Sequence, residues 1–139
     1  MIELKNIRQI DLQTITDSRG SVSVLESGKN TPFEVKRTFH IYNVEENAER
    51  GSHAHKKNEQ VYACLNGSVT ITFDDGINKE DFVLSDPSKG LYVGPMMWHT
   101  LKNFSPGTIF FVWNSMGYDE GDYIKDYDEF LKIANENRL

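Results

Sequence analysis

The stretch that decides the fold is RGSHAHKKNEQ, residues 50–60. It contains two histidines, His53 and His55, separated by a single residue. Successive side chains of a β-strand point to opposite faces, so this spacing places both imidazoles on the same face. In a barrel, an inward face would bring the two rings into one small volume. We therefore treat the pair as a candidate site, although an isolated pair of this kind is more often part of a polar surface loop.

A second informative stretch, GLYVGPMMWH, covers residues 90–99. Its glycines and proline bend the chain ahead of a strand that begins with Trp98 and His99, and strand alternation sends those two side chains in opposite directions. Taken alone, His99 is best explained as a buried core histidine. Together with the first stretch, it becomes a third candidate site residue.

Most of the remaining chain is typical of short strands separated by turns. Alternating or β-branched segments predict strands at residues 21–26, 34–44, 61–65, 68–76, 79–84, 90–93, 98–104 and 108–114. Asn66-Gly67 and Asp75-Gly76 carry hairpin signals, since these residue types tolerate the positive φ of a tight turn. The pattern predicts an all-β sandwich or small barrel.

Hydrophobic periodicity changes near the C-terminus. Apolar residues recur at helical spacing over about residues 122–137, with Asp122 available as the N-cap. We expect one short helix packed on the β body. Because no linker or repeat interrupts the chain, we expect a single domain over residues 1–139, a length that suits one hydrophobic core.

Charge and composition exclude several functional classes. The 139 residues carry 15 Lys+Arg and 21 Asp+Glu, a formal net charge of −6, which argues against a nucleic-acid polymer as the partner. No stretch approaches the roughly 20 apolar residues needed to span a bilayer, so no membrane partner is expected. The single cysteine, Cys64, cannot form an intramolecular disulfide. We therefore expect a soluble protein of the reducing cytoplasm.

The two histidine stretches together resemble the paired motifs of the cupin superfamily, G-x-H-x-H-x3-E and G-x4-P-x3-H-x3-N. The resemblance implies a cupin barrel, which is a double-stranded β-helix or jelly roll, with the C-terminal helix appended. Many cupins hold a transition metal, and the side chains equivalent to the ligands are His53, His55, Glu59 and His99. Here the segment from proline to histidine is one residue shorter than in the metal-binding form, and a one-residue shift turns a side chain to the opposite face. We therefore expect no metal and no cofactor, with a metal-dependent cupin oxygenase or isomerase as the alternative.

A closer resemblance covers nearly the whole chain. The residues that carry it are Asp17-Ser18-Arg19-Gly20, Pro32-Phe33, Lys36-Arg37, residues 50–60, residues 90–95, Trp98-His99, Tyr118-Asp119-Glu120 and Asp122-Tyr123-Ile124. In this order they look like the nucleotide-sugar 3,4-ketoisomerases, metal-independent cupins that convert dTDP-4-keto-6-deoxy-D-glucose into a dTDP-3-keto-6-deoxy-hexose. The resemblance implies an isomerase whose partner is this dTDP-linked keto sugar. It also implies a homodimer, often with exchanged N-terminal strands, in the deoxysugar pathway that supplies 3-amino-3,6-dideoxy sugars for lipopolysaccharide O-antigen or S-layer glycan.

The same resemblance implies roles for individual side chains. His55 is expected to be the base that removes the proton from carbon 3, and His53 its partner, because an imidazole accepts and donates protons near neutral pH. Arg37 and Arg50 are expected to bind the diphosphate, since the guanidinium fork matches phosphate oxygens.

Two further residues bear on the product. Family members that form the galacto-configured 3-keto sugar tend to carry Arg and His where gluco-forming relatives carry Tyr and Arg, and this chain has Arg19 and His99. We therefore expect the galacto product. A non-catalytic module that binds sugar nucleotides is a further alternative, as is an epimerase acting on the same substrate.

Overall fold

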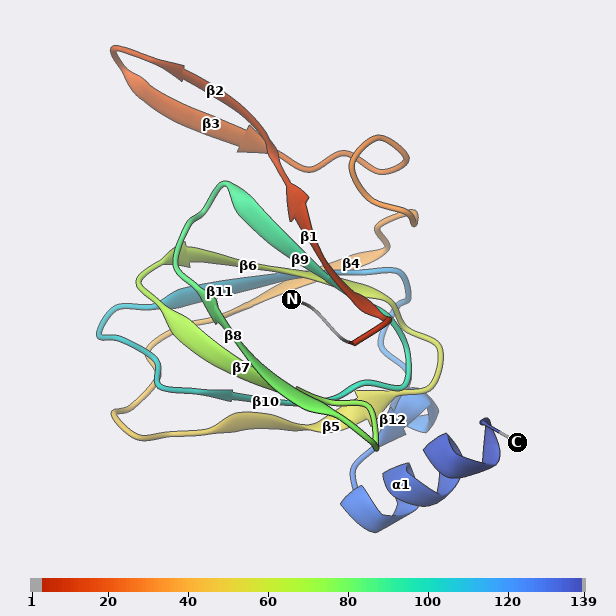
Figure 1. Cartoon of the computed structure of the whole chain (residues 1–139). Coiled ribbons are helices and arrows are strands. Elements are labelled where there is room, and N and C mark those ends of the chain that lie inside the picture. Colours follow the sequence, from red (N-terminus) through yellow and green to blue (C-terminus); the bar gives the residue numbers. More distant parts are fainter. Residues whose placement is uncertain (1–3, 139) are drawn as a thin grey trace.

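The computed structural model describes residues 4–138. Two antiparallel five-stranded sheets face each other and enclose the core (Figure 1). In spatial order, the first sheet contains β1 (Ile7–Asp11), β9 (Lys89–Val93), β6 (Gln60–Asn66), β11 (Ile109–Asn114) and β4 (Arg37–Ile41). The second contains β12 (Tyr123–Ile124), β5 (Arg50–His55), β10 (Trp98–Lys102), β7 (Val69–Asp74) and β8 (Lys79–Leu84). The predicted all-β barrel with a C-terminal helix is confirmed.

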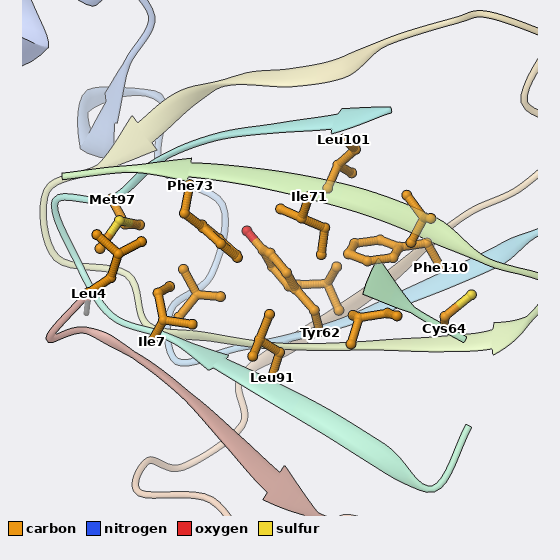
Figure 2. Close-up of a cluster of buried hydrophobic side chains, with 14 residues drawn as sticks. Leu4, Ile7, Tyr62, Cys64, Ile71, Phe73, Leu91, Met97, Leu101 and Phe110 are labelled. Carbon is orange, nitrogen blue, oxygen red and sulfur yellow. The ribbon is translucent and has the colours of Figure 1, made fainter. Parts of the chain in front are cut away.

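The core lies between the two sheets, where alternate side chains of each strand point inward (Figure 2). On β7, Val69, Ile71 and Phe73 are buried while the intervening threonines are half-buried, as the alternation predicts. The buried cluster consists of Leu4, Ile7, Tyr62, Cys64, Val69, Ile71, Phe73, Leu84, Leu91, Val93, Met97, Leu101, Phe110 and Val112. Cys64 is fully buried and free, and burial raises the pKa of its thiol.

The prediction of a hairpin at Asn66-Gly67 is wrong. Strand β6 pairs with β9 and β11, and β7 pairs with β8 and β10, so this turn carries the chain from one sheet to the other. Gly67 has φ of +79°, and a Cβ there would lie 2.5 Å from the Thr108 hydroxyl oxygen. The local signal identified a tight turn correctly, but a turn signal does not say which strands pair.

A two-stranded hairpin extends beyond the barrel near the N-terminus (Figure 1). It consists of β2 (Gln13–Asp17) and β3 (Gly20–Val24), of which only the second was predicted. The side chains of Ile15 and Val22 face each other across the hairpin and are 59% and 60% exposed. Both apolar side chains therefore face solvent in the single chain.

The C-terminal helix α1 (Tyr127–Glu136) begins five residues later than predicted. Its N-cap is Asp126, whose side chain accepts hydrogen bonds from the backbone N–H groups of Asp128 and Glu129. Asp122, the predicted N-cap, instead ends the short 3-10 helix η1 (Glu120–Asp122) and is followed by β12. Pairing of β12 with β5 holds residues 123–124 extended, which delays the start of the helix. Among the described residues, no helix is both long and apolar enough to cross a membrane.

Candidate active site

Three histidine rings meet on the inner face of the second sheet. His53 and His55 come from β5, and His99 comes from β10, where it is paired in register with His53. The ring centroids of His53 and His99 are 4.6 Å apart, and those of His53 and His55 are 5.2 Å apart. Gly51 permits this close approach, because its φ is +89° and a Cβ would lie 3.1 Å from the His99 carbonyl oxygen. The strand-spacing prediction that His53 and His55 share a face is therefore confirmed by the geometry.

The three rings line a cavity of about 170 Å³. The other residues of its wall are Phe39, Ile41, Arg50, Gly51, Gln60, Tyr62, Leu101, Phe110, Val112 and Tyr123. Trp98, next to His99 in the sequence, points the other way and packs against Tyr127 and Phe130 of α1. The expectation that Trp98 and His99 point in opposite directions is met.

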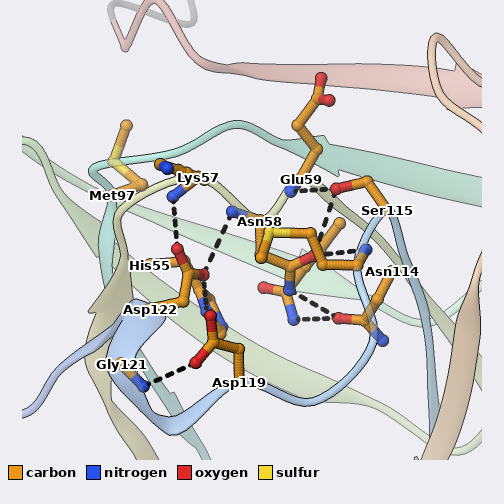
Figure 3. Close-up of polar contacts among 12 residues, drawn as sticks. His55, Lys57, Asn58, Glu59, Met97, Asn114, Ser115, Asp119, Gly121 and Asp122 are labelled. Atoms are coloured by element: carbon orange, nitrogen blue, oxygen red, sulfur yellow. Dashed lines mark hydrogen bonds and ion pairs between the residues drawn. The ribbon is translucent and has the colours of Figure 1, made fainter.

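His55 is held by a buried carboxylate. Its Nδ1 lies 3.1 Å from Asp122 Oδ2, and its Nε2, buried at the cavity wall, has no hydrogen-bond partner among the described residues. Asp122 in turn accepts hydrogen bonds from the backbone N–H groups of Lys57, at 2.7 Å, and Asn58, at 3.2 Å (Figure 3). Because a carboxylate accepts, His55 Nδ1 must donate, and this tautomer leaves the Nε2 lone pair directed to the cavity.

Burial lowers the pKa of His55 to about 4, and the nearby His53 adds to this effect, whereas the hydrogen bond to Asp122 opposes it. The imidazole is therefore neutral at pH 7 and able to accept a proton. Burial also lowers the pKa of His53, and it lowers that of the fully enclosed His99 well below the usual value. His99 Nδ1 lies 3.3 Å from the Met97 carbonyl oxygen, which only accepts, so Nε2 of this ring is again the unprotonated nitrogen.

The predicted arginines are placed unequally. Arg50 lines the cavity and is exposed. Arg37 on β4 is half-buried, and its positive charge contributes to the lowered pKa of His55. Its Nε is buried without a hydrogen-bond partner in the described part of the chain. Arg19 lies in the turn between β2 and β3, pairs with Asp17 at 2.6 Å, and has a side chain that is 88% exposed. It does not line the cavity of its own barrel.

Glu59, the fourth side chain of the metal-binding alternative, does not lie in the cavity wall with the three histidines. Glu59 accepts a hydrogen bond of 2.6 Å from the Tyr92 hydroxyl and is absent from the cavity wall. Over residues 4–138, no three or more His, Cys, Asp or Glu side chains are grouped in a way that could hold a metal ion. The set of His53, His55, Glu59 and His99 is thus not assembled in this structure.

Two residues of the site were not anticipated in this role. Asp122 was expected as the N-cap of the C-terminal helix, and Tyr123 was expected within that helix. Both reach the histidines because β12 pairs with β5, which sets Tyr123 opposite His55 with ring centroids 4.5 Å apart. Asp122 and His55 are 67 residues apart in the sequence. The only sequence signal was the position of both residues in the last motif of the resemblance.

Comparison with known proteins finds relatives over nearly the whole chain. The family model described as "FdtA: WxcM-like, C-terminal" matches residues 5–135. A TDP-4-oxo-6-deoxy-alpha-D-glucose-3,4-oxoisomerase of Aneurinibacillus thermoaerophilus is 46% identical over 129 residues, covering 92% of this chain and 93% of that protein.

Solved structures of similar proteins include the QdtA 3,4-ketoisomerase of Thermoanaerobacterium thermosaccharolyticum. A double mutant of it, in complex with TDP, is 40% identical with a TM-score of 0.95, covering 98% of this chain and 99% of that one. A histidine-to-asparagine mutant of the same enzyme was solved in complex with TDP-4-keto-6-deoxyglucose. The WlaRB TDP-quinovose 3,4-ketoisomerase of Campylobacter jejuni is 45% identical with a TM-score of 0.89, covering 93% of this chain and 99% of that one.

Proposed function

Because this chain belongs to the FdtA family and is a 3,4-ketoisomerase of TDP-linked sugars, we propose that it moves the ketone of TDP-4-keto-6-deoxy-D-glucose from carbon 4 to carbon 3 by histidine acid/base catalysis. The observation that carries this proposal is the neutral His55, whose Nε2 is unpartnered at the cavity wall while Nδ1 is held by Asp122. A neutral, oriented imidazole is what removal of a proton next to a carbonyl requires.

The reaction is a balanced internal transfer. His55 takes the proton from carbon 3, the electron pair forms the double bond between carbons 3 and 4, and the carbonyl oxygen on carbon 4 takes up a proton. The resulting enediol loses the proton of the oxygen on carbon 3 and gains one on carbon 4, which leaves the ketone on carbon 3. One hydrogen has moved between carbons and one between oxygens, so the balance requires no outside oxidant. Donors of the cavity wall stabilise the developing oxyanion.

His53 is the second catalytic histidine of the proposal. Its ring lies between those of His55 and His99 and contacts Tyr123 at 5.0 Å between centroids. One QdtA mutant has a tyrosine replaced by arginine, and the mutant solved with the 4-keto sugar has a histidine replaced by asparagine. In sequence, that tyrosine and that histidine are separated by the same number of residues as Arg19 and His53 in this chain. This spacing supports a role for His53 at the reacting sugar, where it orients the sugar or stabilises the enediolate.

Arg37 and Arg50 bind the diphosphate in this proposal. Arg50 stands at the exposed part of the cavity wall, and Arg37 has a buried donor without a partner among the described residues. A buried guanidinium donor is costly unless a ligand satisfies it, and phosphate oxygens satisfy it well. The nucleotide would therefore lie across the mouth of the cavity, with the sugar inside.

Arg19 takes part only if the protein is a homodimer. Its hairpin extends beyond its own barrel with an exposed apolar pair, so Arg19 reaches a cavity only in a second copy of the chain (Figure 1). We propose that the hairpin packs on that copy and presents Arg19 to its sugar site. The opposite case, a monomer, would leave Ile15 and Val22 in water.

The product proposed is the galacto-configured 3-keto sugar. In the QdtA double mutant, a tyrosine became arginine and an arginine became histidine, and the two positions are as far apart as Arg19 and His99 are here. This supports the assignment of Arg19 and His99 to the positions that control the face of carbon 4. The product would then serve synthesis of a 3-amino-3,6-dideoxy sugar for a surface glycan, in the cytoplasm.

The proposal is tested by incubating the protein with TDP-4-keto-6-deoxyglucose in the presence of a chelator and identifying the product by NMR. We expect a ketone at carbon 3 and an axial hydroxyl at carbon 4. A 3-keto product with an equatorial hydroxyl at carbon 4 would overturn the galacto configuration but keep the ketoisomerase activity. An unchanged 4-keto sugar would contradict the enzyme assignment, and an epimer that keeps its 4-ketone would replace it with epimerase activity.

A further inference from the structure

A chain of buried amides links the cavity to the backbone behind it. Asn58, Gln60 and Asn114 are 3%, 3% and 0% exposed, and none of them was assigned a role above. Asn114 Oδ1 accepts hydrogen bonds of 2.9 Å from both Asn58 Nδ2 and Gln60 Nε2. Gln60 Oε1 then lies 2.8 Å from the hydroxyl oxygen of Tyr62, which lines the cavity. These hydrogen bonds therefore run from the buried core to the cavity wall. Figure 3 shows the first of them, between Asn58 and Asn114.

The direction of every hydrogen bond in this chain is fixed by backbone groups at its ends. The backbone N–H of Met116 can only donate, so the Asn58 atom that it contacts at 3.2 Å is Oδ1, and Nδ2 must donate to Asn114. The carbonyl of Arg37 can only accept, so the Asn114 atom near it is Nδ2. No amide can be turned around without placing two donors or two acceptors together in the core, where an unsatisfied polar group is costly.

These fixed hydrogen-bond directions also determine how the Tyr62 hydroxyl is oriented. With Gln60 Nε2 committed to Asn114, Oε1 faces the tyrosine, and the Tyr62 hydroxyl must donate its one hydrogen to it. The remaining lone pairs of the oxygen accept. Burial raises the pKa of Tyr62 strongly, so the hydroxyl stays protonated and acts neither as a base nor as an oxyanion. Tyr62 therefore offers the cavity a permanent acceptor, and the partner opposite must be a donor.

On the basis of the proposed function, we propose that Tyr62 accepts a hydrogen bond from the hydroxyl on carbon 2 of the sugar, and that Gln60 and Asn114 are positioning residues that fix this polarity. The oxygen on carbon 3 begins as a hydroxyl and ends as a carbonyl, and the oxygen on carbon 4 does the reverse. Tyr62 can only accept from the sugar, so a hydrogen bond from the oxygen on carbon 3 or carbon 4 would be lost whenever that oxygen is a carbonyl. Among the hydroxyls next to the reacting carbons, only the one on carbon 2 remains a donor throughout the reaction.

The test compares TDP-4-keto-6-deoxyglucose with its 2-deoxy analogue, TDP-4-keto-2,6-dideoxyglucose, on the wild type and on Tyr62→Phe. We expect the wild type to lose about 10-fold or more in kcat/KM on the analogue, and Tyr62→Phe to lose about as much on the natural substrate, mainly through KM. The two losses should not add, so Tyr62→Phe should treat both substrates alike. Additive losses, or a wild type indifferent to the 2-hydroxyl, would overturn the inference.

Two further variants separate this role from general damage. Tyr92→Phe removes a hydroxyl that donates to Glu59 outside the cavity wall, and it should keep the wild-type preference for the 2-hydroxyl. Gln60→Met frees the Tyr62 hydroxyl to rotate and should reduce that preference while the far-UV spectrum stays native. If Gln60→Met keeps the full preference, the positioning role is wrong. If the wild type converts neither substrate, the proposed function itself fails, which is a different outcome from additive losses.

Discussion

The cavity wall and the N-terminal hairpin carry proposed site residues in opposite states. His55 and His99 are 5% and 4% exposed, and their orientation is set by Asp122 and by the Met97 carbonyl. The Arg19 side chain, in contrast, is 88% exposed, and its hydrogen bonds within residues 4–138 are to Asp17 of the same turn. A single chain therefore assembles all the histidines proposed for proton transfer, whereas Arg19, proposed to control the product, lies outside the cavity of its own barrel.

The largest effect is expected at the base. His55→Asn keeps a donor for Asp122 but removes the acceptor at the cavity wall, so kcat should fall by about 10³-fold or more. The measurement is the rate of 3-keto product formation at pH 7, with TDP binding measured alongside. Full activity with native TDP binding would show that His55 is not the base.

A large effect is also expected on stability below pH 6.5. The pKa of His55 is about 4 in the folded protein and about 6.5 when unfolded. Between these values the unfolded chain binds more protons, so the free energy of unfolding falls as the pH falls, by about 3 kcal/mol for this group. Urea unfolding between pH 7.5 and 4.5 measures it.

His55→Asn supplies the control for that slope. The variant should reduce the dependence of unfolding free energy on pH and leave the part that the buried His53 and His99 contribute. A matched change at the exposed His40, His40→Asn, should not reduce it in the same way. An identical slope in the wild type and in His55→Asn would contradict a buried, neutral His55.

The next effect concerns Asp122. Asp122→Asn keeps the shape but allows an amide N–H to face His55 Nδ1, which favours the wrong tautomer, and kcat should fall by about 10²-fold with little change in KM. Asp119→Asn is the matched control, because Asp119 is the N-cap of the same 3-10 helix and accepts its hydrogen bond from the Gly121 N–H, whereas Asp122 bonds to His55. An equal loss of kcat in the two variants would mean that Asp122 supports the backbone of the 3-10 helix and does not orient His55.

The smallest effect is expected for the hairpin. Arg19→Ala should lower kcat/KM by about 10-fold and alter the configuration at carbon 4, a smaller loss than at His55 or Asp122 because the exposed arginine does not transfer a proton. Co-expressed Arg19→Ala and His55→Asn chains should give hybrid dimers with one intact site, more active than either parent dimer. No recovery would mean that Arg19 does not serve the partner's cavity, which would remove the contrast between hairpin and barrel.

Features that depend only on the alternation of side chains along a strand could be predicted from the sequence. Alternation placed His53 and His55 on one face and separated Trp98 from His99, because a strand has a period of two residues. Alternation also predicted the buried face of β7. These outcomes follow from neighbouring residues alone.

Contacts between distant segments could not be predicted in the same way. Asp122 has the composition of a helix cap, and only the pairing of β12 with β5 brings it to His55. Asn66-Gly67 has the composition of a hairpin, but strand pairing elsewhere makes it a passage between sheets. The amide chain from Asn58 to Tyr62 likewise depends on β6 and β11 lying side by side. Sequence patterns therefore located the histidines, whereas the folded barrel supplies the groups that orient them.

Histidine-catalysed transfer of the ketone can be followed directly by ¹³C NMR of the wild-type protein with TDP-4-keto-6-deoxyglucose labelled at carbon 3 and carbon 4. The proposed mechanism predicts that the carbonyl signal moves from carbon 4 to carbon 3 and that His55→Asn shows no such movement. A carbonyl signal that stays on carbon 4 in the wild type, or that moves equally fast in His55→Asn, would contradict it.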